Sequence, residues 1–133
     1  MNVSYIIAGG LALLGAAVHG TGGHMLIVRR LRTDTLPSTL FGSPSATRVM
    51  VWVTWHLVTV TFAVTGATLL GCGGSTPGAH CSGMGRVIAA QFAAFAIVGV
   101  GHAIASGNAR FLFRHPAPWA FVAVAVLAWV GSG

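Results

Sequence analysis

Long stretches without a charged side chain constrain this sequence more than any other feature. No Asp, Glu, Lys or Arg precedes Arg29, and none occurs between Arg48 and Arg86, between Arg86 and Arg110, or after Arg114. Only 6% of the 133 residues are charged, whereas a soluble domain carries about 25% charged residues to wet its surface. The sequence therefore excludes an ordinary soluble enzyme and a disordered tail, and it predicts that the lipid bilayer is the solvent.

The apolar stretches predict four membrane-spanning helices. A span needs about 20 apolar residues at a rise of about 1.5 Å each, and the candidate spans are approximately 4–28, 49–71, 87–107 and 116–131. The last is the shortest and begins at Pro116, a residue suited to a first helical turn. Nothing in the sequence alternates with the period of a barrel strand. We therefore expect an all-α fold, an up-down-up-down four-helix transmembrane bundle formed by a single domain over residues 1–133.

Arginine gives the expected orientation of this bundle. The sequence has no Lys and no Glu, and Asp34 is its only acidic residue. Six of the seven arginines fall in the first and third loops, which lie on the same side and should be cytoplasmic. Both termini then lie on the non-cytoplasmic side of the cell inner membrane. The positive charge is a topology signal, so we expect no nucleic-acid partner. The first span is too long for a cleaved signal peptide and lacks a basic start, so we expect it to be retained.

Two cysteines, Cys72 and Cys81, flank a Gly- and Pro-containing loop on the side expected to be oxidising. This arrangement predicts a disulfide that joins the second span to the third. A soft-metal site that includes His80 is the alternative. Two Cys and one exposed His are too few ligands for a closed site, which favours the disulfide.

Four of the six histidines fall inside the predicted spans, where ionisable side chains are costly and mark pathways, cofactors or ions. Counting from Arg29, His19 should lie about 15 Å below the cytoplasmic edge. The same arithmetic places His56 and His102 at about 12 Å and His24 at about 7–8 Å. Three helices thus bring one imidazole each to a similar depth. This convergence predicts a shared guest on the cytoplasmic side of the membrane.

The expected guest is haem b or a transition-metal ion (Zn, Cu or Fe). A neutral imidazole binds a metal through one nitrogen and donates its other N–H to a nearby acceptor. Thr59 follows His56 by one turn and Ser106 follows His102 by one turn, so both hydroxyls are candidate acceptors, and Trp55 is a candidate neighbour of the guest. Haem b would use two axial histidines in an aromatic pocket, whereas an ion would use three and keep an open position. The candidate ligands for either guest are His19, His24, His56 and His102.

The spacing of the first two histidines limits how they can share this guest. His19 and His24 are five residues apart, which puts them about 140° apart around an ideal α-helix. They can share an ion only if the glycines Gly20, Gly22 and Gly23 distort the backbone. Otherwise one is a ligand and the other a supporting or proton-relay group.

Two functions follow from these residues. The first is a membrane protein that binds haem b or a metal ion for redox chemistry or as a metal-dependent enzyme. The alternative is a non-catalytic accessory subunit, in which the histidines only form hydrogen bonds between helices, worth about 0.6 kcal/mol each. The expected partners are the lipid bilayer and either further copies of the chain or a larger membrane complex. The sequence identifies no reaction and no catalytic residue.

One resemblance is carried by residues of the first two spans. The pattern His19-x4-His24, followed by Arg48 and by the sequence WHLVT over residues 55–59, resembles a group of short four-span bacterial membrane proteins of unassigned function. The resemblance covers those two spans. It implies a shared four-helix architecture and supplies no activity. The abundance of Ala, Gly and Arg without Lys also indicates a GC-rich bacterial genome.

Overall fold

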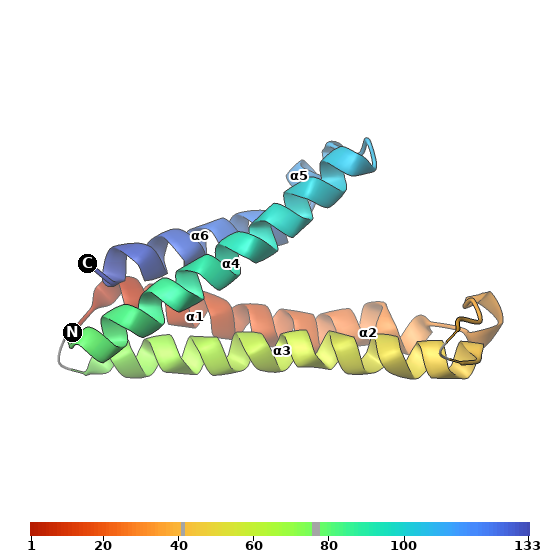
Figure 1. Ribbon diagram of the computed structural model, residues 1–133, viewed down its shortest axis with the longest axis horizontal. Coiled ribbons are helices and arrows are strands. Elements are labelled where there is room, and N and C mark those ends of the chain that lie inside the picture. The colour runs from red at the N-terminus through yellow and green to blue at the C-terminus, as the bar shows by residue number, and fades with distance from the viewer. Residues whose placement is uncertain (41, 76–77) are drawn as a thin grey trace. The chain divides into compact units, whose positions relative to one another are not determined.

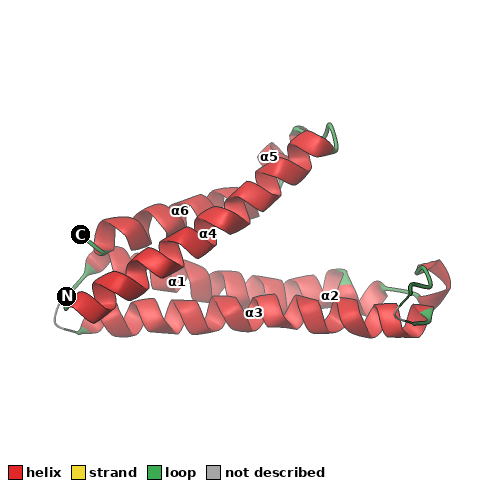
Figure 2. Ribbon diagram, in the orientation of Figure 1, coloured by secondary structure: helices red, strands yellow, loops and turns green. Residues whose placement is uncertain are grey.

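The computed structural model describes residues 1–40, 42–75 and 78–133, and every regular element in these ranges is a helix (Figure 2). The prediction of an all-α fold is thereby confirmed. Segment η1 is π-helical, and η2 and η3 are single 3₁₀ turns. The elements in chain order are α1 (Val3–Ala17), η1 (Val18–Gly23), α2 (His24–Leu26), η2 (Val28–Arg30), η3 (Thr33–Thr35), α3 (Pro44–Gly74), α4 (Ala79–Ala105), α5 (Arg110–Arg114) and α6 (Ala117–Gly131).

Three helical segments are long and apolar enough to cross a membrane, namely Val3–Arg30, Pro44–Gly74 and Ala79–Ala105. The fourth apolar helix, α6, has 15 residues. At a rise of about 1.5 Å per residue it extends about 22 Å, which is shorter than a hydrocarbon core of about 30 Å.

The second and third helices begin earlier than hydropathy predicts. Helix α3 begins at Pro44 rather than near residue 49, and α4 begins at Ala79 rather than near residue 87. Hydropathy marks where apolar residues begin, whereas a helix continues through polar residues until something stops its backbone. Pro44 is such a boundary, because proline lacks an N–H and is tolerated only in the first turn.

Backbone contacts divide the chain into two compact units. The larger unit consists of Met1–Ala12 and Thr65–Gly133, and the smaller unit is Leu13–Val64. Helices α1 and α3 therefore contribute to both units, whereas α4, α5 and α6 belong to the larger one (Figure 1). Within the larger unit, α4 packs beside α6 (Figure 1).

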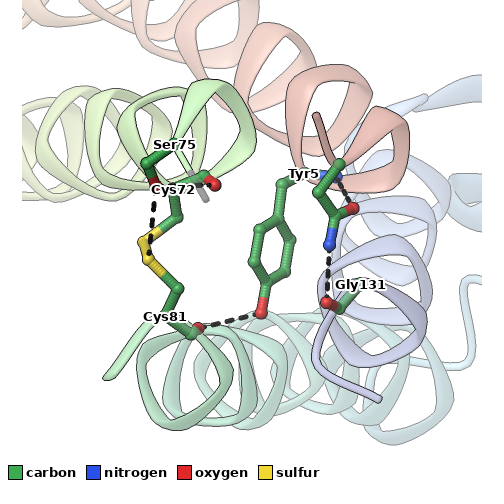
Figure 3. The surroundings of a disulfide bond; sticks show 6 residues. Tyr5, Cys72, Ser75, Cys81 and Gly131 are labelled. Carbon is green, nitrogen blue, oxygen red and sulfur yellow. Dashed lines mark hydrogen bonds between the residues drawn. A yellow bond between two sulfur atoms is a disulfide. The ribbon is translucent and has the colours of Figure 1, made fainter. Parts of the chain in front are cut away.

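Tyr5 is one of the largest fully buried side chains of the larger unit and is only 2% exposed. Its hydroxyl donates a hydrogen bond to the carbonyl of Cys81 over 2.9 Å (Figure 3). Two glycines make room for the ring. A Cβ on Gly131 would lie 2.5 Å from Cδ1 of the tyrosine, and a Cβ on Gly85 would meet the tyrosine hydroxyl. Asn2 adds a hydrogen bond of 2.7 Å to the carbonyl of Gly131.

The predicted disulfide is confirmed. Cys72 near the end of α3 is bonded to Cys81 near the start of α4, with their Cα atoms 5.5 Å apart (Figure 3). The bridge therefore ties together two helices of the larger unit. Residues 76 and 77 of the intervening loop lie outside the described residues.

Small residues on the first helix are buried, as expected where lipid supplies no hydrophobic drive for helix association. Ala8, Ala12 and Ala16, spaced four residues apart, are 0%, 2% and 7% exposed. In the smaller unit, the first helix and η1 contact α3 through glycines. A Cβ on Gly15 would lie 3.7 Å from the ring of Phe62. Such contacts let the two backbones approach closely.

Candidate functional site

The segment that carries His19 departs from α-helical geometry. Residues Val18–Gly23 form the π-helix η1, in which bonds between residues i and i+5 widen the turn. Single π-turns of this kind occur frequently at functional sites. The segment contains Gly20, Gly22 and Gly23, the glycines that have to distort the backbone if His19 and His24 are to share an ion. In the structure both histidines contact α3.

His24 and His56 contact each other in the smaller unit. The Nδ1 atom of His24 lies 3.2 Å from the Nε2 atom of His56, and the ring centroids are 5.2 Å apart with the planes tilted by 38°. Trp52 packs against the His56 ring, and the centroids of the two rings are 4.4 Å apart. Two imidazoles from different helical segments thus meet with two nitrogens facing each other.

His19 has a separate set of partners on the next turn of α3. Its ring stacks on Trp55 with centroids 4.2 Å apart and an interplanar angle of 9°. The Trp55 indole N–H donates to the backbone carbonyl of His19 over 2.9 Å. The Nδ1 atom of His19 lies 2.9 Å from the Thr59 hydroxyl, and Phe62 approaches the ring edge-on at 5.7 Å. These four contacts fix both the position and the orientation of this imidazole.

The Thr59 hydroxyl favours one tautomer of His19. This hydroxyl donates to the carbonyl of Trp55 over 3.3 Å, so its oxygen is free to accept from Nδ1–H of the imidazole. The Nε2 atom then keeps the lone pair, which is the form in which a histidine binds a metal or accepts a proton.

Beside His19 lies a pocket of about 430 Å³ within the smaller unit. Its wall is mainly one face of α3, and it combines apolar side chains with three threonines. The lining residues are His19, Thr39, Thr47, Met50, Val51, Thr54, Trp55 and Val58. A small apolar guest with one hydrogen-bonding group would suit this lining.

The predicted ligand His102 belongs to the larger unit, in α4. Its side chain is exposed and packs edge-on against Phe111, with centroids 6.3 Å apart. The Ser106 hydroxyl donates to the backbone carbonyl of His102 over 2.8 Å. That His102 joins the other histidines stays a prediction. Within the described part of the chain, no three His, Cys, Asp or Glu side chains are grouped as a metal ion would require.

Two pairings differ from those that the sequence suggested. Thr59 was expected to accept from His56, whereas it contacts His19, and His56 contacts His24. The similar depth expected for His19 and His56 stays a prediction. A usable signal was present in Gly20, because a Cβ there would lie 2.7 Å from the Thr59 side chain. Small residues facing larger ones set the register between neighbouring helices.

Comparison with known proteins does not identify a function for this site. No protein-family model, no curated protein and no solved structure matches the chain. A function therefore has to be inferred from the residues themselves.

Proposed function

We propose that this protein is an integral membrane protein that binds a transition-metal ion through His24 and His56. The membrane placement is supported by the three helices that are long and apolar enough to span a bilayer. The short helix α6 forms the fourth crossing, with local thinning of the bilayer to match its length. The arginine-rich loops lie on the cytoplasmic side of the inner membrane, as the positive-inside rule requires.

The distance between the two histidines carries the proposal of a metal. Metal–nitrogen bonds of about 2.0–2.1 Å put two ligand nitrogens of a tetrahedral ion about 3.3–3.4 Å apart. The nitrogens of His24 and His56 are 3.2 Å apart. An ion can therefore bridge the rings in place of the hydrogen bond, once the donating ring carries its proton on its other nitrogen and both rings turn so that their lone pairs point at the ion. Imidazole ligands suit Zn, Cu and Fe.

The surrounding residues support the pair in distinct ways. Trp52 packs on the His56 ring and restricts its rotation. Catalytic metal sites usually have three protein ligands and one open position. With two histidine ligands, the ion keeps two or more positions for water or for a bound molecule. His19, held by Trp55 and Thr59, is positioned as a proton-relay group rather than as a ligand.

The same distance favours a bare ion over haem b for this pair. Two axial nitrogens on opposite sides of one iron are separated by two metal–nitrogen bonds, about 4 Å, with a porphyrin between the rings. His24 and His56 are closer than that and face each other directly. Nearby, Gly23 packs against Trp55, which leaves no layer for a macrocycle between η1 and α3. Haem b would need a different pair of axial histidines.

Metal analysis of the purified protein tests the proposal. The full chain is purified in detergent through a tag without histidines and without chelator, and its metal content is measured by mass spectrometry. Titration with Co²⁺ then reports a tetrahedral site by visible absorption. We expect about one equivalent of metal ion per chain in the wild type, and loss of the metal ion in both His24→Ala and His56→Ala. The matched controls His80→Ala and His115→Ala alter exposed histidines and should keep the metal.

The outcomes separate the candidate guests. Metal content that is unchanged in both pair variants would overturn the ligand assignment. A Soret band in the purified protein, lost in His102→Ala, would replace the ion with haem b. Protein that binds neither metal nor haem would support the accessory subunit, in which the 3.2 Å contact is only a hydrogen bond between neutral imidazoles of a homo-oligomer or larger complex.

A further inference from the structure

A second pocket, of about 550 Å³, lies in the smaller unit where η2 and η3 meet the first turns of α3. Four of its seven lining residues are arginines. The lining residues are Arg29, Arg30, Leu31, Arg32, Thr33, Asp34 and Arg48. This concentration of guanidinium groups in one concave surface is distinct from the histidine pair and has no part in the metal site proposed above.

The charge of this pocket is not balanced by the chain. Asp34 is the only acidic residue in the sequence, and both of its carboxylate oxygens already accept from Arg32, over 3.1 Å and 2.8 Å. Four arginines against one aspartate leave a net charge of +3. Because no other carboxylate side chain exists in the sequence, the counter-charge has to come from outside the chain. A phosphate is suited to this role, since its oxygens accept from several guanidinium N–H groups at once.

Apolar side chains next to the pocket indicate the source of that phosphate. Several apolar residues shortly before Arg29 and shortly after Arg48 are exposed, as are apolar residues elsewhere along the long helices, whereas Val28 itself is only 3% exposed. The exposed residues near the two arginines are Met25 (62%), Leu26 (63%), Ile27 (50%), Val49 (60%), Met50 (53%), Trp52 (48%) and Val53 (42%). A free phosphate ion needs only the arginines. A phospholipid needs a cationic group and an adjacent apolar surface for its acyl chains.

We propose that this pocket binds the phosphate headgroup of an anionic phospholipid, whose acyl chains lie along the exposed apolar residues beside it. The arginines at the end of Val3–Arg30 are at the level where a spanning helix leaves the hydrocarbon core. The lipid comes from the leaflet on the arginine-rich side. This inference rests on the membrane placement proposed above and is independent of the metal.

Thermal unfolding in the presence of defined lipids tests the pocket. The purified full chain in mild detergent is titrated with phosphatidylglycerol, with phosphatidylcholine of the same acyl chains, or with inorganic phosphate. We expect phosphatidylglycerol alone to raise the unfolding temperature. Each lost arginine contact should weaken lipid binding about fivefold, so Arg29→Gln/Arg48→Gln should abolish most of the rise. Arg110→Gln/Arg114→Gln removes the same charge outside the pocket and is the matched control.

Several results would overturn the proposal. If both double variants lose the lipid-dependent rise in unfolding temperature equally, the rise depends on net charge and not on the pocket. Protection by inorganic phosphate as strong as that by phosphatidylglycerol would replace the lipid with a free anion. Equal protection of the wild type by both lipids would remove the headgroup from the explanation.

Two controls separate this proposal from the proposed function. Alkaline extraction of cell membranes tests the membrane placement. Extraction of the chain from the membrane would contradict the proposed function. A chain that stays in the membrane but shows no lipid preference would contradict only the lipid-binding pocket. The metal content of Arg29→Gln/Arg48→Gln should equal that of the wild type, because these arginines are not ligands.

Discussion

Gly23 packs so closely on Trp55 that a Cβ atom at residue 23 would overlap the indole ring. One residue earlier, Gly22 has no atom within 4 Å of the same position. The two glycines belong to the same π-helical segment, yet only one is required by packing. The contact also holds η1 against α3 at Trp55, the residue on which the His19 ring stacks.

Alanine substitutions at these two glycines should therefore differ. Gly23→Ala forces the indole or the backbone to move, and overpacking of this kind costs about 1–3 kcal/mol. Gly22→Ala should stay within about 1 kcal/mol of the wild type, because the added methyl group meets nothing and alanine favours helices. Unfolding in detergent, followed by circular dichroism, gives both values. Equal destabilisation by the two substitutions would contradict the close contact with Trp55.

The sequence was sufficient for the helical fold and for the disulfide. Lipid leaves a spanning backbone few alternatives to a helix, so apolar length alone identifies the long helices, although α3 and α4 begin earlier than hydropathy predicts. Ala8, Ala12 and Ala16 are spaced four residues apart and are all buried, as small residues at contacts between helices are. The Cys72–Cys81 bridge followed from a short loop between two helices.

The arrangement of the histidines could not be predicted in the same way. A helical wheel assumes 100° per residue, and a single π-turn rotates every residue that follows it. His24 lies just after such a turn, so its pairing with His56 was not accessible from spacing. Register between helices is set by side-chain packing, which hydropathy does not report.

Substitutions at Tyr5 should separate its hydroxyl from its ring. Tyr5→Phe removes the hydrogen bond to Cys81 and should cost about 0.6 kcal/mol, the average for hydrogen bonds between membrane helices. Tyr5→Ala leaves a cavity in the larger unit and should cost about 3–5 kcal/mol. Gly85→Ala should also destabilise, since its methyl group meets the tyrosine hydroxyl. Gly83→Ala, which meets nothing within 4 Å, is the control.

The disulfide gives a test of orientation in intact cells. Cys72 and Cys81 are expected on the oxidising face, so a membrane-impermeant maleimide should label them only after reduction. Ser38→Cys, made in a Cys72→Ser/Cys81→Ser background, places a single thiol in the arginine-rich loop. This thiol should stay unlabelled until the cells are permeabilised. Labelling of residue 38 in intact cells would reverse the proposed orientation.

The hydrogen bond between Thr59 and His19 should control which imidazole nitrogen carries the proton. Thr59→Val keeps the shape of the side chain and removes the acceptor of Nδ1–H, so we expect a loss of about 0.5–1.5 kcal/mol in stability. Thr59→Ser keeps the hydroxyl and should restore most of it. Nitrogen NMR of labelled histidine reads the tautomer directly: the wild type and Thr59→Ser should carry the proton on Nδ1, and Thr59→Val should lose that preference. Identical spectra for all three proteins would mean that the hydroxyl does not set the tautomer of His19, and the proton-relay role would then lose the support of the Thr59 contact.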